Sequence, residues 1–167
     1  EYLRAGLHYV DTLHAHKKDP QSVDIHRAEV AWRLTRKNVY VALSNFAEAI
    51  YRMMLEPRAR QWHVIEFNNL MIQTHMLASQ INAVMHALTT SPQPNPIVTD
   101  HLSTIIPHLQ ADQRDPLPPL PAPIVDGSLP NFAYPMVQLQ KTITNIDAEI
   151  SVIHRHIRPP STSSELT

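Results

Sequence analysis

A long stretch without glycine, divided by a single proline, most constrains the fold of this chain. Residues 27–88 contain no glycine, and their one proline is Pro57. On each side of Pro57, apolar or small side chains recur at alternating steps of four and three residues, the spacing of one helix face. The face before Pro57 comprises Ala28, Trp32, Thr35, Val39, Ala42, Phe46, Ala49 and Met53, and the face after it comprises Val64, Phe67, Met71, Thr74, Ala78, Ile81, Met85 and Leu88. The spacing predicts two long helices that form a helical hairpin at Pro57.

Other segments with helical periodicity predict three further helices. Helices over about 2–17, 97–110 and 131–158 join the hairpin arms, which cover about 22–56 and 60–89. The chain therefore reads as all-α, an antiparallel helical bundle of four to five helices, without a convincing strand. We expect the second, third and last helices to form its core. The inward faces of the fourth and last helices should comprise Val98, Leu102, Ile105 and Leu109, and Met136, Leu139, Ile143, Ile146, Ile150, Ile153 and Ile157.

The length and the distribution of proline indicate one domain with a distinct tail. A chain of 167 residues is long enough for a single core. We expect one bundle domain over 1–158, interrupted by a proline-rich connector at about 115–130. Residues 159–167 are rich in Pro, Ser and Thr, which predicts a disordered tail.

The overall composition excludes several classes of function. Fourteen Lys and Arg against 15 Asp and Glu give a formal charge of −1, which does not favour nucleic acid as a partner. The chain has no cysteine and therefore no disulfide or thiolate chemistry. No apolar run is long enough to span a bilayer, and no signal peptide is visible. Because the chain begins at Glu1, directly in helical sequence, we interpret it as an excised fragment.

The sequence shows no local pattern of catalytic or metal-binding residues. None of the 11 histidines lies three or four residues from another, which is the spacing that a metal site on one helix face requires. Gly6 and Gly127 are isolated, so no glycine-rich phosphate loop is present. We therefore predict no catalytic residue, no metal site and no cofactor. His75 is expected to be a partly buried histidine bonded to a neighbour.

A group of basic residues in the second helix is the best candidate for an interaction surface. Arg33, Arg36 and Lys37 are spaced to lie on one side of a helix, and Asn38 adjoins them. Glu29 lies four residues before Arg33 and is placed to neutralise part of this charge. The plain interpretation is a solvated face. The alternatives are an acidic partner segment, anionic lipid headgroups or, as the weakest, nucleic acid.

Four segments of the hairpin resemble a known family. Residues 33–38 (Arg-Leu-Thr-Arg-Lys-Asn), 42–45 (Ala-Leu-Ser-Asn), 53–57 (Met-Met-Leu-Glu-Pro) and 74–81 (Thr-His-Met-Leu-Ala-Ser-Gln-Ile) carry the resemblance. Together they are similar to the cytoplasmic C-terminal region of fusaric-acid-resistance (FUSC) type bacterial inner-membrane proteins, in the subgroup related to aromatic-acid exporters. The family-motif positions are Leu55, Glu56, Pro57, His75 and Leu77.

The resemblance covers residues 27–88, with looser agreement in the last helix, and this chain departs from the family in places. Met76 stands where the family has a second leucine, and the proline-rich connector has no counterpart.

The resemblance implies a non-enzymatic domain of an efflux transporter, at the cytoplasmic face of the bacterial inner membrane. Its role would be in assembly, in regulation or as a vestibule beneath the pore. The implied partners are the membrane domain of the same protein, a second copy in a homo-oligomer, and anionic lipid headgroups or small aromatic acids, with no nucleic acid.

Two other functions remain open from the residues alone. A free-standing helical adaptor would bind a partner helix, or present residues 116–121 (Pro-Leu-Pro-Pro-Leu-Pro) as a polyproline ligand. An enzyme would need a pocket that holds a histidine or a carboxylate with a strongly perturbed pKa.

Overall fold

The fold is an all-α bundle, as the sequence predicts. The computed structural model describes residues 1–21, 23–111, 118–122 and 130–157. Within these residues it contains no strand and five α-helices, together with a short 3-10 turn, η1, at Arg58–Arg60. The helices are α1 (Tyr2–Lys18), α2 (Ile25–Met54), α3 (Val64–Thr90), α4 (Pro96–Gln110) and α5 (Pro130–Ile157). The predicted tail, 159–167, and residues 115–117 and 123–129 of the predicted connector lie outside the described residues.

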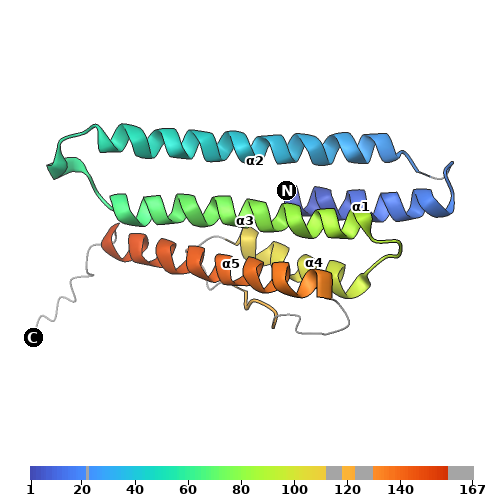
Figure 1. Ribbon diagram of the computed structural model, residues 1–167. Helices are drawn as coiled ribbons and strands as arrows, with labels where there is room; N and C mark the ends of the chain where they lie inside the picture. Colours follow the sequence, from blue (N-terminus) through green and yellow to red (C-terminus); the bar gives the residue numbers. More distant parts are fainter. Residues whose placement is uncertain (22, 112–117, 123–129, 158–167) are drawn as a thin grey trace, which may run out of the picture.

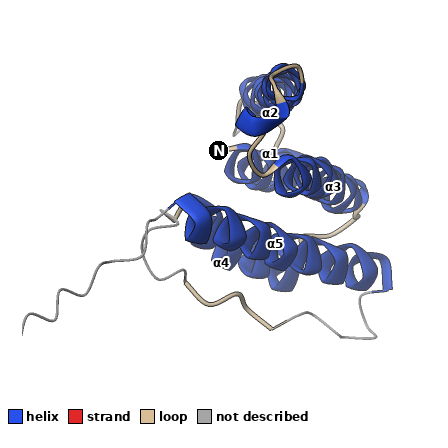
Figure 2. Cartoon of the chain, turned by 90° about the vertical axis from the view of Figure 1, so that its left-hand side faces the viewer, coloured by secondary structure: helices blue, strands red, loops and turns tan. Residues whose placement is uncertain are grey.

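The helices are arranged in three layers (Figure 2). Helix α2 forms the first layer alone, α1 and α3 form the middle layer, and α4 and α5 form the third. Helices α2 and α3 run in opposite directions along the bundle (Figure 1). The most extensive contacts of α3 are nevertheless with α5, and those of α2 are with α1. The second helix is therefore in more extensive contact with the first helix than with its neighbour across Pro57.

The main hydrophobic core excludes α2, which corrects our expectation that the second helix belongs to it. Trp32 and Val39 of α2 pack only at the edge of the core as partly buried side chains. Four other helices supply the buried residues. These are Tyr2, Leu3, Leu7 and Val10 of α1, Ile81, Val84, Met85 and Leu88 of α3, Val98, Leu102 and Ile105 of α4, and Phe132, Met136, Leu139 and Ile143 of α5.

The inward face of α2 differs from the predicted one at two positions after Val39, while Phe46 and Met53 are partly buried as predicted. Leu43 and Ile50 are buried, whereas Ala42 and Ala49, which the periodicity placed inward, are exposed. An α-helix has 3.6 residues per turn, so a strict alternation of three and four residues drifts around a straight helix. One additional step of four residues, from Val39 to Leu43, returns the apolar face to the bundle.

The end of α4 also differs from the prediction, because His108 is buried in place of Leu109. Leu109 is 40% exposed. The His108 ring contacts the backbone oxygen of Pro118 through Nδ1 at 2.6 Å, and Oδ2 of Asp147 through Nε2 at 2.8 Å. This histidine thereby joins α4, the segment 118–122 and α5.

Pro57 ends the second helix as predicted, through a turn that is closed by a side chain. Helix α2 ends at Met54, and Pro57 precedes η1. Nε2 of Gln61 donates to the backbone oxygens of Met54 at 2.9 Å and Glu56 at 2.8 Å. These bonds satisfy carbonyl groups that have no partner within the helix. Helix α3 begins at Val64, later than the predicted start near residue 60.

At Gly6, α1 approaches side chains of both α3 and α2 closely. A Cβ atom at this position would lie 2.6 Å from Sδ of Met85 and 3.3 Å from Nε1 of Trp32. Met85 is fully buried and has little room to move. A side chain at position 6 would therefore push α1 away from α3.

We expect Gly6→Val to lower the free energy of unfolding by about 1–3 kcal/mol, because the added atoms overpack a close contact. Urea denaturation followed by circular dichroism measures the change. The control is Ala31→Val at an exposed position of α2, which should cost less than about 0.7 kcal/mol through helix propensity alone. Equal losses in the two variants would contradict the importance of the Gly6 contact.

Candidate functional site

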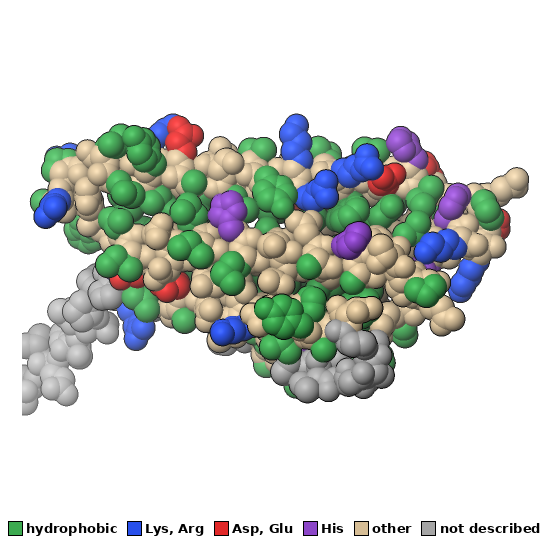
Figure 3. All heavy atoms as spheres, viewed as in Figure 1, with side chains coloured by type: hydrophobic (Ala, Val, Ile, Leu, Met, Phe, Trp, Pro, Cys, Tyr) green, Lys and Arg blue, Asp and Glu red, His purple; other side chains and the backbone are tan. Residues whose placement is uncertain are grey.

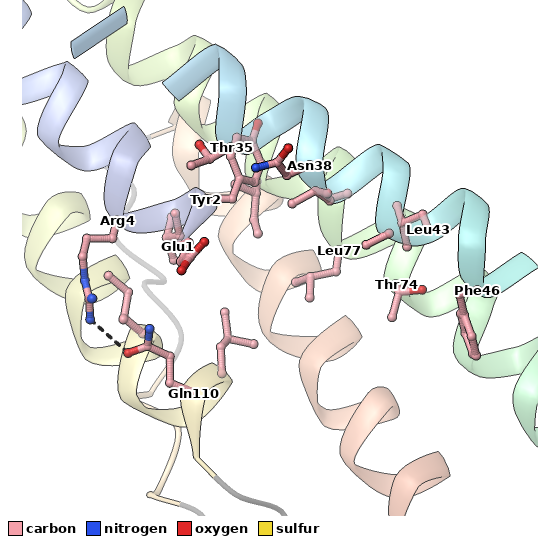
Figure 4. A pocket seen from close by; sticks show the side chains of 17 residues that line it. Glu1, Tyr2, Arg4, Thr35, Asn38, Leu43, Phe46, Thr74, Leu77 and Gln110 are labelled. Atoms are coloured by element: carbon pink, nitrogen blue, oxygen red, sulfur yellow. Dashed lines mark hydrogen bonds between the residues drawn. The ribbon is translucent and has the colours of Figure 1, made fainter. Parts of the chain in front are cut away.

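An apolar cavity lies between the middle of α2 and helix α3, beside the N-terminal end of α1 (Figure 4). Its volume is about 490 Å³, within the range of small-molecule sites in proteins. Four helices contribute to its walls, which are mainly apolar. The apolar lining comprises Leu3 of α1, Val39, Ala42, Leu43 and Phe46 of α2, Leu77, Ala78 and Ile81 of α3, and Ile106 and Leu109 of α4.

Polar groups gather at one end of this cavity, where α1 meets the end of α4. Nη2 of Arg4 donates to Oε1 of Gln110 at 2.9 Å, and Glu1 lies beside them. Thr35, Asn38 and Thr74 add polar atoms along the walls. The Thr74 hydroxyl donates to the backbone of its own helix, at Leu70. The cavity is therefore apolar along most of its length and has one polar end, at Arg4.

A chain of hydrogen bonds joins α1, α3 and α2 beside the cavity. The Tyr2 hydroxyl donates to Oδ1 of Asn82, and Nδ2 of Asn82 donates to the Tyr40 hydroxyl at 2.8 Å. Burial raises the pKa of Tyr2 above its usual value, and the charge of Arg36 opposes this effect in part. Tyr2 therefore stays neutral and remains a hydrogen-bond donor.

The four predicted interaction residues do not form one surface. Arg33, Arg36 and Lys37 border a shallow hollow on α2, whereas Asn38 lines the cavity on the side toward α3. Arg33 pairs with Glu29 at 2.5 Å, and the Arg36 guanidinium lies 5.7 Å from the centre of the Trp32 ring. Figure 3 shows basic side chains along the edge of the molecule that α2 occupies. The predicted pairing of Glu29 with Arg33 is confirmed.

The family-motif positions lie in two separate places. Leu55, Glu56 and Pro57 are exposed at the turn after α2. Leu77 lines the cavity. His75 is exposed, so our expectation of a partly buried histidine is wrong. It follows Thr74, which lines the cavity, and its own side chain faces away from the bundle.

One histidine and carboxylate pair has the geometry of a general base and its orienting acid, but it is closed to a substrate. His108 is 5% exposed, and its two ring nitrogens are occupied by Pro118 and Asp147. No ring nitrogen is free to take a proton from a substrate, so the pair has a structural role. Sequence spacing could not reveal it, since Asp147 lies 39 residues from His108.

The described residues contain no cluster of histidine, aspartate and glutamate that would hold a metal ion. Among the helices of the same part of the chain, none combines the length and the apolar character that a membrane span requires.

Comparisons with family models, with curated proteins and with solved structures find no match to this chain. The resemblance described above stays a prediction.

Two histidines, His14, which is buried, and His101, which is partly buried, give the stability of the bundle a dependence on pH. Burial lowers the pKa of His14 and of His101, and at His14 the charge of Lys17 acts in the same direction. Nε2 of each ring is buried and makes no hydrogen bond within the described residues. The folded state therefore favours the neutral rings, while the unfolded chain takes up protons near the usual pKa of about 6.5.

We expect the free energy of unfolding to fall as the pH drops from about 6.5 toward the lowered pKa values of these histidines. The double variant His14→Gln/His101→Gln should lose less stability than the unmodified chain between about pH 7.5 and about pH 5. Urea titrations at the two pH values measure the difference. An unchanged loss in the double variant would show that other groups control the acid sensitivity.

Proposed function

We propose that this chain is a non-enzymatic, ligand-binding domain of a bacterial inner-membrane exporter, at the cytoplasmic face of the membrane. The observation that carries the proposal is the apolar cavity of about 490 Å³ with its single polar end. A cavity of this kind fits an amphipathic small molecule better than a peptide or a sugar. The family resemblance supplies the context of the exporter, whose own membrane domain would be the principal partner.

Small aromatic acids are the ligands that best fit the lining. The ring of such a compound would lie against Leu3 and Ile106, which line the cavity next to its polar end. Its carboxylate would reach Arg4, whose guanidinium is exposed and has donors beyond the one that bonds Gln110. Glu1 beside Arg4 opposes a second negative charge, which favours monocarboxylates over dicarboxylates. Binding of an aromatic acid here would regulate the exporter or retain its substrate before transport.

A regulatory or vestibule role is better supported than catalysis. The described side chains around the cavity include no histidine, and their carboxylate is that of Glu1 alone. Neither a base with an orienting partner nor a nucleophile beside a base lies at this site. Binding without reaction is the chemistry that these residues support.

We expect benzoate, as the probe, to bind this chain in isothermal titration calorimetry. Ala78→Phe should abolish binding, because the new ring fills the space next to Leu77 and Ile81. Ala83→Phe is the matched control, since it places the same ring at an exposed position of α3 and should leave the affinity unchanged. Circular dichroism confirms the fold of both variants.

The role of Arg4 is tested with a neutral analogue. Arg4→Gln should weaken benzoate by about tenfold, as expected for the loss of a charged hydrogen bond, and leave benzamide unaffected. Absence of benzoate binding at millimolar concentration, or unchanged binding in Ala78→Phe, would contradict the proposed ligand. A full-length gene without membrane-spanning segments would contradict the exporter context instead.

The turn between α2 and α3 is the part best suited to contact lipid headgroups. Trp62 and Ile65 are 64% and 74% exposed, and the exposed Arg58 and Arg60 precede them in the sequence. Exposed aromatic and aliphatic side chains beside arginines are typical of surfaces that insert into the headgroup region of an anionic membrane.

We expect the chain to sediment with vesicles that contain phosphatidylglycerol and not with neutral vesicles. Arg58→Gln/Arg60→Gln should abolish this binding by removing the attraction to the anionic surface. Lys17→Gln/Lys18→Gln removes the same charge at the end of α1 and serves as the control. Equal effects of the two double variants would show that net charge alone controls the binding.

The alternative of an adaptor that presents a polyproline ligand has less support. The backbone oxygens of Pro118 and Pro121 accept hydrogen bonds from His108 and Gln140, and Leu120 packs against the core. The described part of the segment is thus bound to the bundle. A polyproline ligand needs an accessible backbone and side chains.

A further inference from the structure

The outer face of α2 carries a second apolar stripe. Val30, Leu34, Val41, Tyr51 and Leu55 are 49%, 55%, 48%, 60% and 69% exposed. Successive members are four, seven, ten and four residues apart, which are sums of steps of three and four, so they lie along one side of the helix. Each lies about 200° around the helix from a residue of the buried face, which points them away from α1 and α3. Figure 3 shows hydrophobic side chains along the edge of the molecule that α2 occupies. A helix with apolar stripes on opposite sides normally has both sides covered.

Lys37, Ser44 and Glu48 complete this stripe at the same alternating steps. The whole stripe therefore has the same spacing when read from either end. When a second α2 is laid against the first in the opposite direction, each position faces a defined position of the partner. Val30 meets the partner's Leu55, Leu34 meets the partner's Tyr51, and Val41 meets the partner's Ser44.

The charges of the stripe favour this antiparallel arrangement over a parallel one. In the antiparallel arrangement Lys37 lies opposite the partner's Glu48, and the two-fold symmetry produces this pair twice. In a parallel arrangement in register, Lys37 would face Lys37 and Glu48 would face Glu48, and both contacts would be repulsive. Lys37 is exposed, and the Glu48 side chain is 58% exposed. Glu48 pairs through Oε1 with Arg52 of its own helix, and the second carboxylate oxygen can accept from Lys37 of a partner.

We propose that a second copy of this chain docks antiparallel on the outer face of α2, with the two-fold axis between Val41 and Ser44. Apolar contacts lie at both ends of the interface, and opposite charges fix its register. The surface is distinct from the proposed ligand site, since Leu43 and Phe46 face the cavity from the other side of α2. Dimerisation therefore leaves the cavity open.

Charge reversal provides a sharp test, because both residues are exposed and their replacement does not disturb the core. Sedimentation equilibrium should show a dimer for the unmodified chain. Lys37→Glu and Glu48→Lys should each raise the dissociation constant by at least about tenfold, since each variant creates two like-charge pairs. The double variant Lys37→Glu/Glu48→Lys should restore the dimer. An equimolar mixture of the two single variants should also dimerise, because each supplies the charge that the other lacks.

Cross-linking tests the register, since the chain contains no cysteine of its own. A mixture of Val41→Cys and Ser44→Cys chains should give mainly the mixed disulfide on mild oxidation. A predominance of Val41→Cys homodisulfides would indicate a parallel pair and overturn the proposal. A monomeric unmodified chain at about 100 µM, well above a micromolar dissociation constant, would also overturn it. Single variants that dimerise as well as the unmodified chain would do the same.

Discussion

The contact of Gly6 with Met85 is the constraint on which the layered arrangement depends. Where a glycine allows two helices to approach closely, the side chains around the contact interdigitate and bury more surface than larger residues would permit. Here the approach places α1 beside α3 in the middle layer, with Trp32 of α2 covering the same position. The main core then forms on one side of this layer, and α2 lies on the other. The close approach thus decides which helices share the core and which helix remains at its edge.

The position of α1 also explains why the bundle has a cavity. Helix α1 supports the N-terminal half of α2, and α3 contacts the remaining half, where the Phe46 ring lies edge-on to Phe67. The cavity lies where this support passes from α1 to α3. If α1 extended along the whole of α2, its side chains would fill that space. The cavity and the exposed apolar stripe of α2 therefore have one origin. This helix receives less cover than its apolar residues require.

Local periodicity was sufficient to predict the helices and much of the packing. The inward faces of α3 and α5 lie where the apolar spacing placed them, because each of these helices packs along its length against a continuous neighbour. The face of α2 was displaced after Val39, since no core fixes its rotation there. The contacts that depend on distant parts of the chain were not predictable. His108 with Asp147, and Arg4 with Gln110, join residues 39 and 106 positions apart. No pattern within one helix indicates such pairs.

The hydrogen bond from Asn82 to Tyr40 holds α2 near its midpoint. Before this point Trp32 stacks on Tyr9 of α1, and after it the Phe46 ring packs edge-on against Phe67 of α3. The support of α2 therefore passes from one neighbour to the other near Tyr40. A substitution at Asn82 would remove a bond at the place where neither neighbour alone holds the helix.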